Sequence, residues 1–138
     1  MELKERIVAL DIGTKRIGVA VSDALWMGAT PVKLVIRNKD IQALEEIKKI
    51  CQEYNTKTIL IGVPYNMDGS LGFQAKNCLD FIKPLRENYN ILEQDERLSS
   101  SQAEDYLKLK GKKYTKNKGL VDTTAACIIL QEYLENNR

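Results

Sequence analysis

Residues 7–14 read Ile-Val-Ala-Leu-Asp-Ile-Gly-Thr, an apolar run that ends in a carboxylate, a glycine and a threonine. Its four consecutive apolar residues predict a strand that is buried on both faces. A second β-rich run at residues 17–23 follows at once, so the pair predicts a hairpin with residues 14–16 at its tip. A carboxylate such as Asp11 beside two cations at a strand end is typical of phosphate chemistry. The alternative interpretation is an aspartate that simply starts a turn.

The composition predicts a single domain, residues 1–138, with one hydrophobic core. Hydrophobic residues make up 43% of the chain and charged residues 29%, with a net charge of +2. These values are ordinary for a globular protein and indicate no particular partner. No signal peptide and no membrane-spanning run is apparent, so we expect no membrane association.

The cysteine and histidine counts limit the possible chemistry. The three cysteines are far apart and show no C-x-x-C spacing, which favours reduced thiols in a cytoplasmic protein. The chain contains no histidine. This excludes Ser-His-Asp and Cys-His catalysis and histidine-ligated zinc. General acid or base chemistry must therefore use carboxylates, lysines, tyrosines or metal-bound water.

The rest of the chain predicts alternating strands and helices. A helix between two buried strands implies a parallel crossover, so this order predicts an α/β three-layer fold. We expect Asn38 or Asp40 to cap the first helix, Ile41 to lie on its apolar face, and Pro84 to kink or end the second helix near Lys83. The predicted strands are residues 32–36, 57–64 and 90–96, and the predicted helices are residues 40–54, 71–88, 99–109 and 121–134.

Four carboxylates stand at the ends of predicted elements: Asp11, Asp68, Glu96 and Asp122. Asp122, in the first turn of the last helix, shares a helical face with Ile129, so we expect it to point toward the sheet. In an open α/β sheet, sites lie outside the carboxyl ends of the strands. Clustered carboxylates without histidine are typical of a Mg²⁺ or Mn²⁺ site, and two such ions can flank a phosphodiester.

Each of these features also has a purely structural interpretation. Asp122 can favour the positive end of the helix dipole. Asp68 precedes a glycine, an ordinary turn dipeptide, which is the interpretation that we favour for it. Glu96 can belong to a solvated strand end. Six lysines fall within residues 108–118, and they can form a solvated loop rather than a surface for phosphates.

Four segments together carry a family resemblance. Residues 10–20 match an opening motif, residues 62–72 a central G-x-P-x-N-M-D/N-G motif, residues 95–99 a D-E-R motif, and residues 118–126 a K-x-x-V-D-x-x-A-A motif. In these motifs the sequence resembles the YqgF (RuvX) family, described as Holliday junction resolvases and as pre-16S rRNA nucleases. The resemblance covers nearly the whole chain.

The resemblance implies a ribonuclease-H-like fold, a five-stranded mixed sheet with helices on both faces. It also implies a cytoplasmic, Mg²⁺- or Mn²⁺-dependent phosphodiesterase that acts on the 5′ end of the small-subunit rRNA precursor. The implied catalytic residues and metal ligands are Asp11, Glu96 and Asp122. The second acid is either Glu96 or Asp68, because the strand that ends in Val63 carries no acid of its own.

We expect nucleic acid as the partner, held through its backbone and shape, since few aromatic residues lie near the motifs. The loop with Gly69 is expected to border the site, with that glycine in a conformation that other residues disfavour. Alternatives are a resolvase for branched DNA, an ATP-handling domain and a non-catalytic RNA-binding module. We expect the protein to be a monomer or a weak homodimer. The candidate nucleic-acid-binding residues are Lys15, Arg16, Asn66, Arg97, Lys112, Lys113, Lys116 and Lys118.

Overall fold

The computed structural model describes residues 2–97 and the backbone from residue 118 to the end, with side chains again from residue 124. The helix expected at residues 99–109 lies outside these residues, as do Lys112, Lys113 and Lys116 of the lysine-rich segment.

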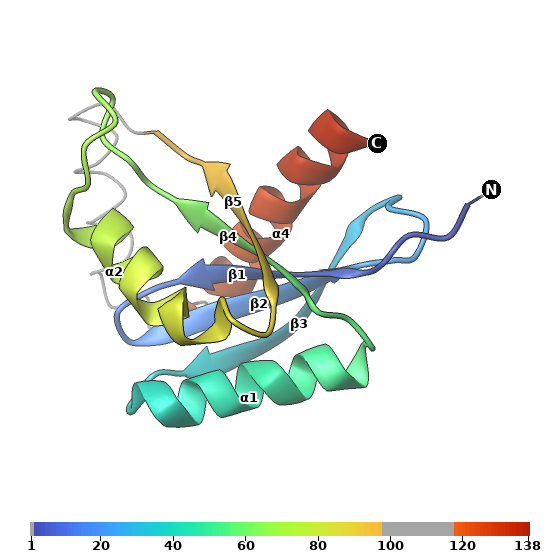
Figure 1. The fold of residues 1–138 in the computed structure, drawn as a ribbon, viewed down its shortest axis with the longest axis horizontal. Helices are drawn as coiled ribbons and strands as arrows, with labels where there is room; N and C mark the ends of the chain where they lie inside the picture. The colour runs from blue at the N-terminus through green and yellow to red at the C-terminus, as the bar shows by residue number, and fades with distance from the viewer. Residues whose placement is uncertain (1, 98–117) are drawn as a thin grey trace.

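Within the described residues, five strands form one mixed sheet in the order β3-β2-β1-β4-β5 (Figure 1). β1, β2 and β3 pair antiparallel, whereas β4 and β5 run parallel to β1. This arrangement confirms the predicted ribonuclease-H-like sheet. The strands are β1 (Ile7–Ile12), β2 (Arg16–Ser22), β3 (Ala29–Ile36), β4 (Thr58–Val63) and β5 (Asn90–Asp95).

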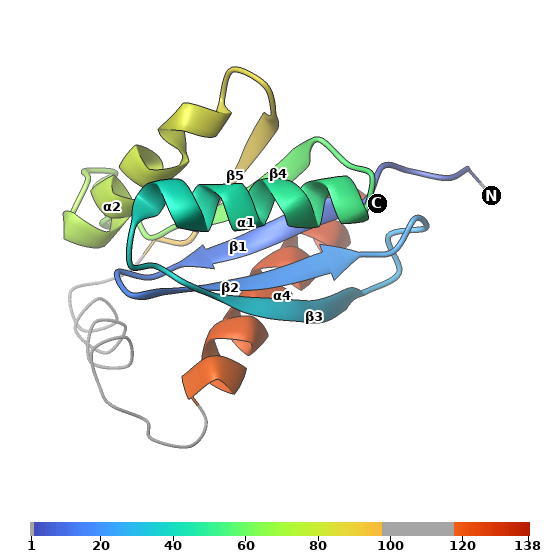
Figure 2. The same ribbon diagram turned by 90° about the horizontal axis from the view of Figure 1, so that it is seen from below.

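Helices cover both faces of the sheet, as the three-layer prediction requires. Helices α1 and α2 lie on one face and α4 lies on the other (Figure 2). No helix in the described part of the chain is long and apolar enough to cross a membrane. The helical elements are α1 (Asp40–Glu53), α2 (Phe73–Ile82), the 3-10 turn η1 (Lys83–Leu85) and α4 (Lys118–Asn137).

Two apolar cores follow from the alternation of side chains along the strands. In β1, Leu10 and Ile12 pack in the core beneath α1 and α2. Ala9 packs in the smaller core beneath α4, together with Leu60 of β4 and Leu130 of α4. Because successive residues face opposite sides, Asp11 shares the α4 face with Ala9.

Two expectations for α1 are wrong. Lys39 occupies the N-cap position and no side chain caps the helix there. Asp40 binds the Arg37 guanidinium instead, which removes it as a cap. Ile41 is 77% exposed, because the buried stripe of α1 begins two residues later at Ala43.

The start of β3 and the end of α2 can also be compared with the predictions. β3 starts at Ala29, so Pro31 lies within an edge strand, beside the register shift between Val19 and Ala20 of β2. An edge strand tolerates proline because its outer side needs no donor. α2 ends at Ile82, and Pro84 falls in the 3-10 turn, as predicted.

The last helix begins a turn earlier than predicted. α4 starts at Lys118, so Asp122 is its fifth residue rather than a member of its first turn. No proline in residues 118–121 prevents the helix from starting there. The dipole interpretation of Asp122 is weakened accordingly, because the effect of the dipole falls off within the first turn.

Candidate active site

The carboxyl ends of β1, β4 and β5 meet at one edge of the sheet, because these strands are parallel. Asp11 lies at this edge, one residue beyond the last β1–β4 pair, Leu10–Ile61. Its side chain is only 3% exposed and lies on the α4 face. The structure therefore gives this carboxylate a buried position at a strand end, where the sequence predicted it.

Glu96 reaches the same face from the end of β5. Its backbone N–H donates to the Val63 carbonyl at 3.0 Å, which continues the ladder with β4 for one more bond. Its side chain lies over Gly62: a methyl group on this glycine would be 3.4 Å from Glu96 Cγ and 2.7 Å from Ile129 Cδ1 of α4. Asp11 and Glu96 therefore face α4 from two strands that are separated by β4.

Gly62 of β4 lies between Asp11 and Glu96, and it contributes no side chain to the face of the sheet that α4 covers. Strands two positions apart are separated by roughly 10 Å. Ile129 of α4 fills part of the space that Gly62 leaves, since its Cδ1 lies where a β-carbon on Gly62 would clash. A larger residue at position 62 would push α4 away from the strand ends that carry both acids.

Glu132 is a third acid at this place, and the sequence analysis missed it. Its carboxyl group hydrogen-bonds to that of Glu96, and Gln94 Nε2 lies 3.4 Å from Glu132 Oε2. Its spacing in the sequence could have identified it, because Glu132 follows Ile129 by three positions and so lies on the same side of α4.

Burial raises the pKa of Glu96 from 4.5 to about 7, with smaller contributions from the Glu132 carboxylate, the hydrogen bond to it and the charge of Asp95. A hydrogen bond between two carboxyl groups requires that one of them is protonated. Glu96 is therefore a carboxyl group that exchanges a proton close to neutral pH.

Asp122 lies in α4 two turns before Ile129, and its side chain is not among those described. Figure 2 shows that α4, the helix that contains Asp122, begins away from the end of β1 and crosses the face of the sheet that Asp11 shares. Among the side chains that the structure describes, no three acids or cysteines are grouped closely enough to hold a metal ion.

The loop after β4 confirms the turn interpretation of Asp68. Its carboxylate accepts hydrogen bonds from the backbone N–H and the hydroxyl of Ser70, at 2.9 and 2.6 Å. These bonds lower the pKa of Asp68, which is exposed. Gly69 has a φ of 85°, in the region that disfavours other residues, as predicted.

Two candidate nucleic-acid-binding residues also shape this loop. Arg97 Nη1 donates to the Met67 carbonyl at 3.2 Å, and its Nε pairs with Asp95 at 2.9 Å. The guanidinium remains about half exposed. Asn66 donates from Nδ2 to the Ser70 hydroxyl at 3.0 Å. Asn66 and Arg97 thus both bind residues of this loop, and Arg97 directly follows Glu96 in the chain.

The two other described candidates lie at the β1–β2 turn. Lys15 is exposed and Arg16 is partly buried. The turn is tight: Gly13 N–H donates to the Arg16 carbonyl at 2.9 Å, and a methyl group on Gly13 would lie 2.7 Å from that oxygen. Lys118 begins α4, and its side chain lies outside the described residues.

Comparison with known proteins gives consistent matches over the full chain. The profile of the family RuvX, described as Holliday junction resolvase, matches residues 5–136. A protein of Gloeothece citriformis named "Putative pre-16S rRNA nuclease" is 41% identical, over 99% of this chain and 93% of its own. A protein of Halothermothrix orenii with the same name is 44% identical, over 94% of each chain.

Solved structures also resemble the chain. RuvC of T. thermophilus in complex with a Holliday junction substrate is 12% identical over 95% of this chain and 94% of that one, with a TM-score of 0.49. The fowlpox virus Holliday junction resolvase is 16% identical over 95% of this chain and 98% of that one, also with a TM-score of 0.49.

Proposed function

Because the chain belongs to the RuvX family, as its four motifs predicted, we propose that it is a metal-dependent nuclease that processes the 5′ end of pre-16S rRNA in the cytoplasm. The observation that carries this proposal is the placement of Asp11 and Glu96. Both lie at the carboxyl edge of the sheet and face α4, the helix that contains Asp122.

The chemistry of these residues fits a hard divalent cation. All three candidates offer carboxylate oxygens, which Mg²⁺ and Mn²⁺ prefer. Glu96 lies beside a second acid, Glu132, and burial together with this neighbour raises its pKa to about 7, so this place carries an excess of acidic groups. Asp11, Glu96 and Asp122 would hold the cation, which supplies Lewis-acid stabilisation of charge on the phosphodiester.

Glu96, rather than Asp68, is the second acid in this proposal. Glu96 faces α4 beside Gly62, as Asp11 does from β1. The carboxylate of Asp68 instead binds Ser70 within its own exposed loop.

Basic side chains around this edge would hold the nucleic-acid backbone. Lys15 projects from the β1–β2 turn, and Arg97 lies beside Glu96 with its guanidinium half exposed. We assign the same role to Arg16, to Asn66 and to the lysines at 112, 113, 116 and 118. Contacts of this kind recognise charge and shape and carry little sequence information.

A cleavage assay tests the proposal. The protein is incubated with a precursor 16S rRNA transcript or with a four-way DNA junction, with Mg²⁺, Mn²⁺ or EDTA. We expect a cut at the 5′ end of the 16S sequence that requires the metal, is lost in Asp11→Asn and is retained in the matched loop variant Asp68→Asn. Metal-dependent cleavage of the junction alone would instead assign the chain to branched DNA. Full activity of Asp11→Asn would contradict the proposed site.

A further inference from the structure

The backbone that directly follows Asp11 is held from the other face of the sheet. The β1–β4 ladder stops at Leu10–Ile61, and two carbonyl groups beyond it are bound by side chains instead. The Ile12 carbonyl accepts from the Cys78 thiol at 3.7 Å, and the Gly13 carbonyl accepts from Arg37 Nη1 at 2.8 Å. The strand end that carries Asp11 stays paired with β2, but on its β4 side it depends on residues outside the sheet ladder.

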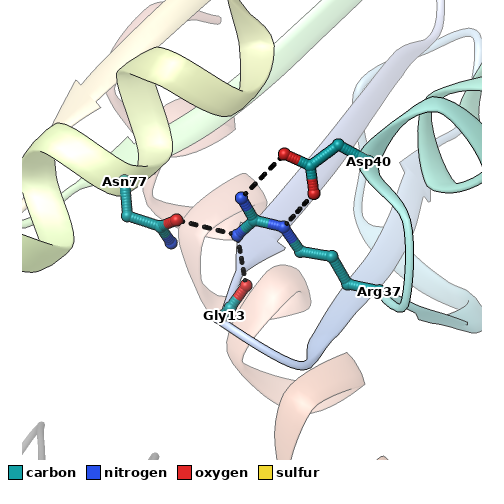
Figure 3. Close-up of polar contacts among 4 residues, drawn as sticks. All are labelled: Gly13, Arg37, Asp40 and Asn77. Carbon is teal, nitrogen blue, oxygen red and sulfur yellow. Dashed lines mark hydrogen bonds and ion pairs between the residues drawn. The ribbon is translucent and has the colours of Figure 1, made fainter.

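Arg37 is the centre of this arrangement (Figure 3). Besides Gly13, its Nη1 donates to Asn77 Oδ1 of α2 at 2.9 Å, and its Nε pairs with Asp40 of α1 at 2.9 Å. The guanidinium also stacks over the Phe81 ring of α2, 4.5 Å from the ring centroid. A single side chain thus connects the β1–β2 turn with α1 and α2.

The backbone of Arg37 holds the same turn a second time, because its N–H donates to the Lys15 carbonyl at 2.9 Å. The Arg37 side chain is only 10% exposed, and Nε, Nη1 and Nη2 all have protein acceptors. Arg37 differs in this respect from Lys15, whose side chain is exposed and available to a phosphate. The charge of Arg37 is used inside the protein rather than on a ligand.

We infer that Arg37 is a positioning residue: it fixes the turn at residues 13–16 and thereby the place of Asp11 at the strand end. This inference rests on the proposed function of Asp11. Reacting groups must be held to within about 0.5 Å, and a misplacement of about 1 Å can cost a hundredfold in rate. A rigid guanidinium with several acceptors is well suited to this task, because it loses little freedom per bond that it forms.

The test compares two variants that disturb the same cluster. Arg37→Met removes every guanidinium bond and keeps an apolar stem of similar length. Phe81→Leu is the matched control, because it weakens the packing under the guanidinium without touching the Gly13 carbonyl. For Arg37→Met we expect kcat to fall tenfold or more while KM for the RNA changes less than threefold. For Phe81→Leu, compared at equal distance from its melting temperature, we expect kcat within threefold of the parent.

Amide hydrogen exchange provides a readout that does not depend on activity. The peptide that spans residues 11–18 should exchange faster in Arg37→Met, while peptides from β4 exchange as in the parent. If Arg37→Met does not fold, Arg37→Lys takes its place, since lysine keeps the charge but lacks the fork that reaches Gly13 and Asp40 together. Unchanged exchange in this peptide, or a loss of kcat no larger than that of Phe81→Leu, would overturn the inference. A parent protein that cuts no substrate would contradict the proposed function, and exchange alone would then decide whether Arg37 holds the turn.

Discussion

Replacing Glu96 with glutamine should stabilise the metal-free protein at neutral and alkaline pH. Glu96 is partly buried beneath α4 and shares a hydrogen bond with Glu132. Its ionised form is disfavoured there by burial and by the neighbouring carboxylates, which raises its pKa from 4.5 to about 7. Glutamine has nearly the same size, carries no charge and can still donate a hydrogen bond to Glu132.

The sign and size of the effect follow from this pKa. Between pH 4.5 and about 7 the folded protein binds more protons at Glu96 than the unfolded chain does, so the free energy of unfolding falls as the pH rises through this window. The full pKa difference corresponds to about 3 kcal/mol. Because the side chain is only partly buried, solvent screening reduces the expected effect to roughly 1–2 kcal/mol.

Urea denaturation with EDTA at pH 5 and at pH 8 measures this difference. The parent should lose roughly 1–2 kcal/mol more than Glu96→Gln between the two pH values. The exposed Glu87, which lies just beyond η1, provides a matched control, and Glu87→Gln should show the pH dependence of the parent. If Glu96→Gln and the parent lose equal stability between pH 5 and pH 8, the raised pKa of Glu96 is refuted.

Three further variants test other parts of the site. Gly62→Ala should cost about 1–3 kcal/mol of stability, because the new methyl group would lie 2.7 Å from Ile129 Cδ1. In a thermal melt, the double variant with Ile129→Val should recover part of this loss, because valine lacks the Cδ1 atom. Asp122→Asn should lower Mn²⁺ affinity in calorimetry and cleavage together without reducing the melting temperature in EDTA; an earlier melt with normal cleavage would assign Asp122 a structural role only. Glutamine at the three lysines Lys112, Lys113 and Lys116 should weaken binding to all RNA sequences alike and reduce the slope of log K against log salt by about 2, and an unchanged slope would remove these lysines from the interface.

Much of the sheet was predictable because its buried strands are nearly continuous apolar runs. β1 and β4 are buried at every position, and their apolar character alone identifies them. The start of β3 is not an apolar run and was therefore not predicted. Thr30 and Pro31 are exposed, and they pair with β2 at the edge of the sheet. Ile41 misleads for a related reason, since helical spacing does not show where the buried stripe begins.

Within the candidate site, only the residues that stand in motifs or at strand ends could be predicted. Asp11 follows an apolar run, Glu96 follows a predicted strand, and both stand in motifs. Glu132 and Arg37 do not, since each acquires its role from distant partners. Arg37 binds Gly13, which is 24 positions away, and Asn77, which is 40 positions away, and no local pattern indicates either contact.

The alternation of side chains along β1 explains how one strand end can be both rigid and acidic. Asp11 faces α4, whereas the contacts to the next two carbonyl groups come from α2 and Arg37 on the side of α1 and α2. The charge of Arg37 is balanced by Asp40, whose pKa is lowered by the hydrogen bond and the charge of this guanidinium. The group that holds the turn therefore adds little net charge near Asp11. A lysine or arginine placed on the α4 face would hold the same turn at the cost of neutralising the carboxylate that the proposed metal site needs.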